Sequence, residues 1–286
     1  MKLVRFGALG NEKPGAIDDD GKIRDLSSCV SDIGGQSLTS VSLDELKQID
    51  LSSLPAVAKG DSEIRLGACV ATPGKFIGIG LNYRDHAIES GAPIPEEPVV
   101  FFKADTSVSG PYDNVIMPLD GSKLDWEVEI AMVIGDVARN VSLDDAASHI
   151  AGYCVVNDVS ERAFQIDRGG SQWGKGKGCD TFGPMGPWMV TADEIEDVQN
   201  LDMWLDVNGV RRQTGNTGTM IFGCHYLVSY LSRFMTLMPG DVITTGTPPG
   251  VGLGMNPNVW LQPGDVMELG ISGLGSQRQT VVAYPD

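Results

Sequence analysis

A succession of short β-like runs, separated by turn residues, dominates the chain from about residue 73 onward. The runs are KFIGIGL, VVFFKA, WEVEIAMVIG, YCVVNDVS, MWLDVNG, DVITTG and DVMELGI. They are rich in valine, isoleucine and aromatic residues, which favour strands, and the chain has 36 glycines and 16 prolines for the turns between them. The sequence therefore predicts a mainly β fold with a few helices, of the α+β class.

The first 70 residues differ from the rest. LVRFGAL is typical of a strand, PGAIDDDGKIRDL of a hairpin around its DDDG turn, and SLDELKQI of a helix. We expect a small N-terminal β-rich domain over 1–70, without catalytic residues, and a larger domain over 73–286. Two further helices are predicted, one over LDDAASHI with Ser142 as N-cap and one over GCHYLVSYLSRF.

The charge balance is strongly acidic, since 21 lysines and arginines stand against 38 aspartates and glutamates, a formal net charge of −17. Such a surface repels nucleic acid and anionic membranes, so neither is expected as a partner. No segment approaches the roughly 20 apolar residues of a membrane span, and the N-terminal segment lacks the apolar run of a signal peptide. We expect a cytoplasmic protein. An anionic substrate would need a local cationic site.

Two glutamates share one face of a predicted strand. In the run DWEVEI (125–130), alternation places tryptophan, valine and isoleucine on one face, and Glu127 with Glu129 on the other. This pair is either a solvated strand face or part of a cation site. Asp158 favours the second interpretation, because it follows another apolar strand at a point where loops display functional groups. Oxygen ligands favour Mg²⁺, Mn²⁺ or Ca²⁺ over zinc.

One histidine of the three in the chain lies near a possible partner. His86 and Glu89 are three residues apart in NYRDHAIE and would face each other if this segment is helical. A carboxylate would raise the basicity of the imidazole and fix its tautomer, as a general base requires. An ordinary surface histidine is the alternative. His149 and His225 lie in helix-like contexts and look structural.

Two glycine-rich segments offer further polar groups. Residues 165–182 contain RGGSQWGKGKGCDTF, whose lysines supply positive charge and whose glycines allow close approach of the backbone. A flexible basic loop would have the same composition. The segment TTGTPPGVG (244–252) carries hydroxyl groups that suit a carboxylate, but it lacks the GK[ST] ending of a phosphate-binding loop.

Five motifs, in the order NYRDHAIE, WEVEIAMVIG, NDVSER, GKGCDTFGPMGPW and TTGTPPGVG, resemble the fumarylacetoacetate hydrolase family over about residues 75–286. The resemblance implies a mixed β-roll around a metal ion, preceded by a small N-terminal domain, and a homodimer. It implies that Glu127, Glu129 and Asp158 are the metal ligands, and that His86 and Glu89 form the dyad that activates water. Mg²⁺ is the expected ion, with Mn²⁺ or Ca²⁺ as alternatives.

The resemblance also assigns residues to the substrate. Lys177 matches the lysine of the family's K-x-x-D-x-F stretch, and its spacing to Asp180 favours it over Lys175. Gln165 and Thr247 match positions that contact the carboxylate end of the substrate in relatives. Arg84 and Lys103 are weaker candidates for the lining of the site.

The activity that the resemblance implies is hydrolysis of a carbon–carbon bond in a 2,4-dioxo acid (an acylpyruvate), giving pyruvate and a carboxylic acid. The chain is most similar to hydrolases of 2,4-diketo-3-deoxy sugar acids, such as L-2,4-diketo-3-deoxyrhamnonate. The alternative is a lyase or decarboxylase that uses the same metal site, such as a ureidoglycolate lyase or an oxaloacetate decarboxylase. A non-catalytic binding protein is a further alternative, which would not require a water-activating dyad.

Overall fold

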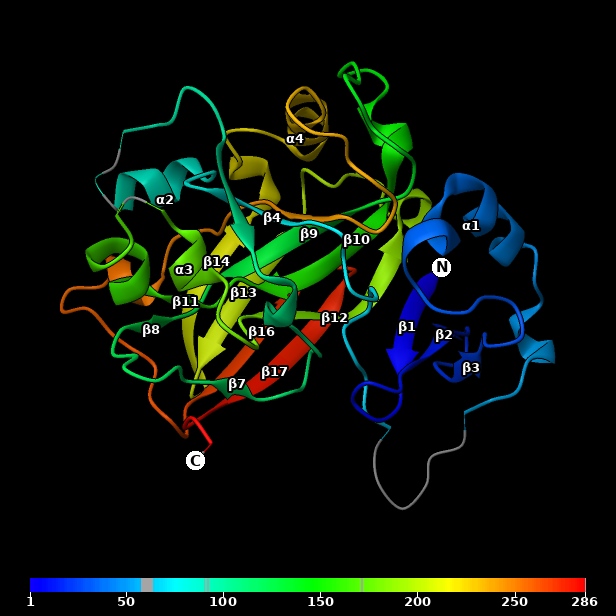
Figure 1. Cartoon of the computed structure of the whole chain (residues 1–286), viewed down its shortest axis with the longest axis horizontal. Coiled ribbons are helices and arrows are strands. Elements are labelled where there is room, and N and C mark those ends of the chain that lie inside the picture. The colour runs from blue at the N-terminus through cyan, green and yellow to red at the C-terminus, as the bar shows by residue number, and fades with distance from the viewer. Residues whose placement is uncertain (58–63, 90, 92, 171, 286) are drawn as a thin grey trace.

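The computed structural model describes residues 1–57, 64–89, 91, 93–170 and 172–285. Strands make up most of its regular structure and form two main sheets, as the sequence predicts (Figure 1). The described residues contain four α-helices: α1 (Ser40–Lys47), α2 (Arg84–Glu89), α3 (Gly174–Lys177) and α4 (Cys224–Ser232). None of the helices in these ranges is long and apolar enough to cross a membrane.

The larger sheet has ten strands, in the order β3-β2-β1-β12-β10-β9-β15-β4-β5, with β6 paired to β12. Its strands are β1 (Lys2–Phe6), β2 (Lys13–Ile17), β3 (Ile23–Asp25), β4 (Phe76–Gly80), β5 (Val99–Lys103), β6 (Val108–Ser109), β9 (Val128–Ile134), β10 (Ile150–Asn157), β12 (Gly183–Thr191) and β15 (Val242–Thr244). β15 lies between β9 and β4, antiparallel to the first and parallel to the second. Two strands from the first half of the sequence, β4 and β9, are therefore joined by one that follows more than 100 residues later.

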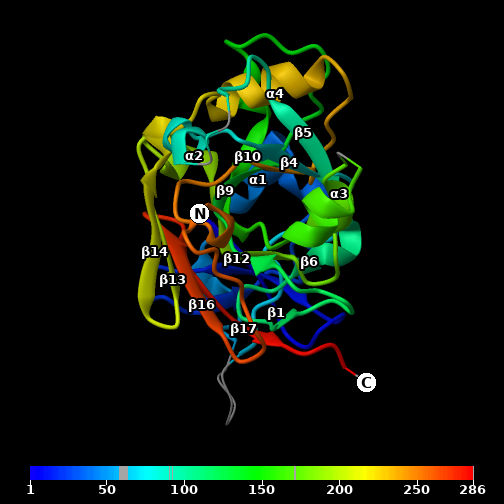
Figure 2. The same cartoon turned by 90° about the vertical axis from the view of Figure 1, so that its left-hand side faces the viewer.

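The second sheet has five strands, β14 (Val210–Asn216), β13 (Asp202–Val207), β16 (Val266–Ile271), β17 (Gly275–Val282) and β7 (Val115–Ile116). It packs beside the larger sheet, as the yellow and red strands of Figure 2 show. Leu205 and Leu269 belong to the same buried cluster as Val128 and Ile130 of β9. A short ladder joins β8 (Leu124–Asp125) to β11 (Ser160–Glu161).

Strand β9 is buried on both faces, which explains why six of its seven residues are apolar. Val128 and Ile130 face the second sheet, whereas Ala131 and Val133 belong to the other buried cluster. Because side chains alternate along a strand, the face of Ala131 is also the face of Glu129. The apolar packing of this face therefore ends where the carboxylates begin.

The N-terminal strands extend the larger sheet. β1 pairs antiparallel with β12, so that Leu3 lies opposite Met189. Leu3 and Ala16 also share a buried cluster with Val156 and Met189. The described N-terminal residues thus share a sheet and a core with the rest of the chain, and the division into domains over 1–70 and 73–286 stays a prediction.

Most of the predicted local elements are present. The DDDG hairpin is formed by β2 and β3, where the Asp18 carboxylate accepts from the backbone N–H groups of Asp20 and Lys22. The helices predicted over SLDELKQI and GCHYLVSYLSRF are α1 and α4. The helix predicted over LDDAASHI is wrong: only a 3-10 turn forms, over Ala146–His149. The chain enters β10 directly after His149, whose carbonyl accepts from the backbone N–H of Gly135 instead of from a following helical turn.

Candidate active site and metal centre

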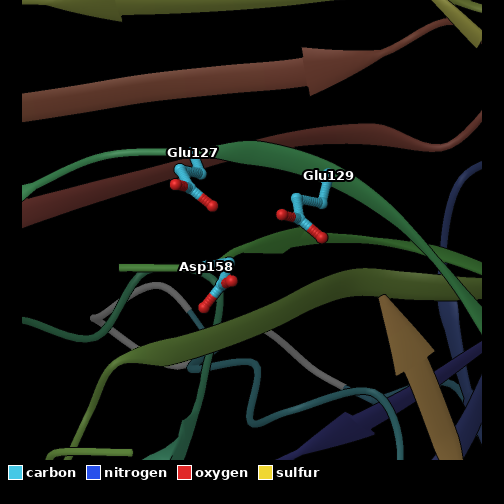
Figure 3. A group of neighbouring side chains, drawn as sticks. All are labelled: Glu127, Glu129 and Asp158. Carbon is cyan, nitrogen blue, oxygen red and sulfur yellow. The ribbon is translucent and has the colours of Figure 1, made fainter. Parts of the chain in front are cut away.

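Strand register brings three carboxylates together. The backbone N–H of Asp158 donates to the carbonyl of Glu127 (2.9 Å), and Val156 lies opposite Glu129 in the antiparallel β9–β10 pair. Residues opposite each other in such a pair point to the same face, so Glu127, Glu129 and Asp158 converge (Figure 3). One oxygen from each lies within 4.8 Å of the others, and all three side chains are buried.

Cationic side chains surround these carboxylates. Lys177 donates to Glu127 Oε2 (2.7 Å) and to Asp158 Oδ2 (2.8 Å), and Lys103 donates to the other oxygen of Asp158. Burial lowers the pKa of Lys177, but the carboxylates of Asp158 and Glu127 outweigh it, and the pKa is raised overall. Lys177 therefore stays charged at neutral pH.

Glu129 is differently placed. Its Oε2 accepts from the backbone N–H of Gly246 (2.9 Å). Burial and the neighbouring carboxylates of Asp158 and Glu127 together raise its pKa well above the usual range. A carboxylate that is costly to ionise among other carboxylates suits a site for a small divalent cation with oxygen ligands. The donor set therefore fits a hard divalent ion.

The predicted dyad is formed. His86 Nδ1 lies 3.0 Å from Glu89 Oε2, one turn apart on α2. Glu89 also accepts from the backbone N–H of Gly250 (3.0 Å), which ties α2 to the loop after β15. The bond from Gly250 therefore orients the Glu89 carboxylate, and the carboxylate in turn orients the imidazole of His86.

The dyad and one of the three carboxylates line the same cavity, of about 410 Å³. Its polar residues are His86, Glu89, Glu127, Arg162, Gln165, Lys177 and Thr247, and its apolar side chains are Ile79, Leu81, Phe101, Ile166, Trp173, Val251 and Leu253. Glycines 80, 246 and 254 complete the wall. A single compartment therefore contains a base with its orienting carboxylate, the edge of the acidic cluster and two cations.

Of the four residues predicted to contact the substrate, two line the cavity and two do not. Gln165 and Thr247 line the cavity, but the Thr247 hydroxyl already donates to the Val128 carbonyl (2.9 Å) and accepts from Gln213. Lys103 lies behind the cavity, buried against Asp158. Arg84 is exposed on α2 and is not among the residues that line the cavity.

The two neighbouring lysines are clearly separated. Lys177 is buried and reaches the carboxylates, whereas Lys175 bonds to the backbone carbonyl of Arg168 at an exposed position. A short helix, α3, turns their side chains to different sides. The spacing to Asp180 thus favours the lysine that the structure places beside Glu127.

Arg162 was not predicted from the sequence as a residue of the site. Its guanidinium lies in the cavity wall and donates to Asp125 (2.8 Å), Gln165 (2.9 Å) and Glu127 (2.6 Å). Asp125 in turn accepts from the backbone N–H of Gly252 (2.7 Å). The sequence did offer a hint, because the arginine that ends NDVSER follows an apolar strand, where an unpaired cation would be costly. Phe101 and Trp173, which also line the cavity, were not predicted either.

Comparison with known proteins agrees with this geometry. The family model described as fumarylacetoacetate (FAA) hydrolase C-terminal matches residues 75–282. A protein from Burkholderia ambifaria, named only as a hydrolase, is 57% identical over 281 residues, which are 98% of each chain.

Solved structures resemble the whole chain. Fumarylacetoacetate hydrolase from Exiguobacterium antarcticum has a TM-score of 0.87 at 34% identity, covering 99% of this chain and 100% of that one. A 2-hydroxyhepta-2,4-diene-1,7-dioate isomerase from Mycobacterium marinum has 0.76 at 30% identity, with all of both chains covered. Maleylpyruvate hydrolase from a Sphingobium species, in complex with manganese(II) and pyruvate, has 0.82 at 28% identity, again over both whole chains. The chain therefore belongs to the fumarylacetoacetate hydrolase family.

Proposed function

We propose that this protein is a divalent-metal-dependent hydrolase that cleaves the C3–C4 bond of a 2,4-dioxo acid, giving pyruvate and a carboxylic acid. The observation that carries the proposal is the His86–Glu89 pair, which lines the same cavity as Glu127 of the acidic cluster. The maleylpyruvate hydrolase of similar fold, solved with manganese and pyruvate, supports it.

Glu127, Glu129 and Asp158 would hold the ion, with Mg²⁺ as the expected metal and Mn²⁺ or Ca²⁺ as alternatives. When bound, a divalent cation supplies Lewis-acid chemistry that polarises the 2-oxo group and offsets negative charge developing there. The buried Lys177 and Arg162 add positive charge on the same side of the cavity. These cations would attract an anionic substrate, which the net charge of −17 would otherwise repel.

His86 would act as the general base. Its imidazole, held by Glu89 at 3.0 Å, would take a proton from water, and the hydroxide would attack the C4 carbonyl. The electron pair of the C3–C4 bond passes to C3 as that bond breaks, which releases the acyl group as a carboxylic acid. Protonation of C3 then gives pyruvate, so that one water is consumed and no oxidant is needed.

Lys177 would stabilise the charge that develops on the pyruvate half. Its ammonium is fixed by two carboxylates, so it need not reorganise as the charge appears. Gln165, which accepts from Arg162 and lines the cavity, would contact the carboxylate end of the substrate. The Thr247 hydroxyl, already engaged with the backbone of β9, would act mainly by shaping this end of the cavity.

The competing activities use the same site without attack by water. A lyase or decarboxylase remains the alternative, and the isomerase of similar fold adds isomerisation of an unsaturated 2-oxo acid to the reactions worth testing. The His86–Glu89 pair favours hydrolysis, because neither decarboxylation nor isomerisation consumes water. We further propose a cytoplasmic homodimer that binds a small 2-oxo acid.

Pyruvate release tests the proposal. The panel contains acylpyruvates, including L-2,4-diketo-3-deoxyrhamnonate, together with oxaloacetate, ureidoglycolate and an unsaturated 2-oxo diacid. Each is incubated with Mg²⁺, with Mn²⁺ or with EDTA. We expect pyruvate and one equivalent of carboxylic acid from an acylpyruvate, abolished by EDTA and restored by added metal. Turnover restricted to oxaloacetate, ureidoglycolate or the diacid would instead assign a decarboxylase, lyase or isomerase.

A further inference from the structure

The part of the cavity wall that continues from Lys177 is aromatic. The Lys177 ammonium lies 5.4 Å from the centroid of the Phe101 ring, and Phe101 packs on Trp173 with centroids 5.6 Å apart and planes at 51°. Both rings line the cavity. A group that extends from a substrate held beside Lys177 therefore meets hydrocarbon surface.

Two glycines of β4 make room for these rings. A Cβ atom on Gly78 would lie 2.2 Å from Phe101 Cζ, and one on Gly80 would lie 2.1 Å from Trp173 Cζ3. Real side chains do not approach so closely, so any other residue at these positions would displace a ring. The positions of the two rings therefore depend on the two glycines of β4, the strand that precedes the dyad.

The rim of the cavity continues the same surface. Ile166 and Leu253 line the cavity, yet their residues are 52% and 37% exposed. Together with the buried Phe101 and the half-buried Trp173, these exposed aliphatic side chains give an apolar path from the interior to solvent. Val251, which is buried, also lines the cavity.

Three of the polar residues that line the cavity already bond to other protein groups. Arg162 donates to three side chains, Lys177 to two carboxylates, and Thr247 both donates and accepts within the protein. A hydroxyl on the acyl group would lose its water without gaining an equivalent partner on the aromatic wall. A second carboxylate would lack a counter-charge, because the lysine and arginine that line the described cavity are paired with acidic groups and serve the pyruvate end in the proposed function.

We infer that the wall formed by Phe101, Trp173, Ile166, Val251 and Leu253 is the acyl subsite, and that it selects an uncharged, hydrocarbon-like acyl group, aryl or branched alkyl. The inference rests on the proposed function for the identity of the scissile bond. It differs from the expectation of a hydroxylated sugar acid, which came from overall resemblance.

A matched pair of substrates separates the two expectations. Isobutyrylpyruvate and lactoylpyruvate, the latter being 2,4-diketo-3-deoxyrhamnonate, differ in one methyl against one hydroxyl on the acyl group. We expect kcat/KM to be about tenfold or more higher for the isobutyryl compound, the usual worth of one group in an apolar pocket. Maleylpyruvate, which carries a second carboxylate, should also be the poorer substrate. A ratio of isobutyryl to lactoyl at or below one would overturn the inference.

A variant at the rim locates the effect. Ile166→Gln should lower the isobutyryl to lactoyl ratio at least about threefold, since it places an amide on the path without disturbing the buried core. Leu143→Gln is the control, because Leu143 is similarly exposed, at 55%, and does not line the cavity. An equal change in both variants, or none in Ile166→Gln, would remove Ile166 from the subsite.

Binding distinguishes failure of this inference from failure of the proposed function. Calorimetric titration of the His86→Ala variant with each acid, in Mg²⁺, measures acyl preference without turnover. Tighter binding of isobutyrylpyruvate with no cleavage by the unaltered enzyme would uphold the subsite and reject the hydrolase. Cleavage with equal or tighter binding of lactoylpyruvate would uphold the hydrolase and reject the subsite.

Discussion

Lys177 touches two of the three clustered carboxylates, and its position shows how burial and pairing act together at the residue scale. A buried ammonium is costly unless charged oxygens surround it, and Glu127 and Asp158 provide them. The same contacts fix the lysine before any substrate arrives. Arg162 plays a comparable part by joining Glu127 to Asp125 and Gln165.

Replacing Lys177 by methionine should reduce kcat/KM by about two to three orders of magnitude, the range for loss of one preorganised electrostatic group. Methionine fills much of the same volume, so circular dichroism should show the native fold. Lys175→Met is the matched control, since Lys175 is two residues away and bonds to a backbone carbonyl at an exposed position. Loss of activity in the control alone would show that the other lysine acts in catalysis.

Replacing His86 by alanine should lower the hydrolysis rate by roughly two to four orders of magnitude while metal binding is retained, because general-base catalysis is lost and the ligands are untouched. Glu89→Gln should give a smaller loss, since an amide still contacts the imidazole but no longer stabilises its charged form. Stopped-flow pyruvate assays and Mg²⁺ titration would measure both effects. Wild-type turnover by His86→Ala would exclude the dyad from the reaction.

At the scale of elements, β4 and β9 place the site from two directions. β9 presents Glu129 toward the other two carboxylates of the acidic cluster, and the two glycines of β4 make room for the aromatic wall. Both strands pair with β15, which leads into the loop that contacts Glu89 and Glu129. The geometry of the site is therefore coupled to the packing of three adjacent strands.

Gly80→Ala should destabilise the protein by about 1–3 kcal/mol, the range for forcing an extra group into a packed interior. The added methyl would meet the Trp173 ring at 2.1 Å, so the ring must shift. Urea unfolding would give the free-energy change. The double variant Gly80→Ala/Trp173→Leu should lose less unfolding free energy than the sum of the two single variants. Strict additivity would show that Gly80 does not make room for the Trp173 ring.

At the scale of the whole molecule, the N-terminal strands belong to the same sheet as β9 and β10, which position the acidic cluster. β1 extends the sheet from β12, and β12 is bonded to β10, after which Asp158 follows. The buried cluster that contains Leu3 also contains Ala131 and Val133 of β9. A substitution that destabilises the N-terminal strands should therefore also destabilise the site.

Leu3→Ala should test this coupling. Leu3 is fully buried, and its truncation should cost about 2–5 kcal/mol of unfolding free energy. Because the core is shared, we expect tryptophan fluorescence and pyruvate-releasing activity to be lost in one transition, at a lower urea concentration than in the unaltered protein. Two separate transitions, with activity persisting after the first, would instead indicate an N-terminal unit that unfolds on its own.

Sequence patterns predicted what depends on neighbouring residues and missed what depends on distant ones. Alternation in DWEVEI placed Glu127 and Glu129 on one face, and i,i+3 spacing paired His86 with Glu89. The partners of Arg162 and the pairing of β1 with β12 join residues far apart in the chain, so no local period could reveal them. The helix predicted over LDDAASHI failed in a segment whose last residues contact distant ones, since the His149 carbonyl accepts from the backbone N–H of Gly135.

The central position of β15 has a consequence for synthesis of the chain. Val242 follows Ile134 by 108 residues (242 − 134), so the edges of β9 and β4 have no partner there until most of the polypeptide has left the ribosome. At about 5–20 residues per second this interval lasts roughly 5 to 20 seconds, during which two apolar strand edges can pair with other nascent chains. Messages truncated before β15 should therefore yield aggregating products, and translation that pauses between β10 and β15 should increase the demand for chaperones.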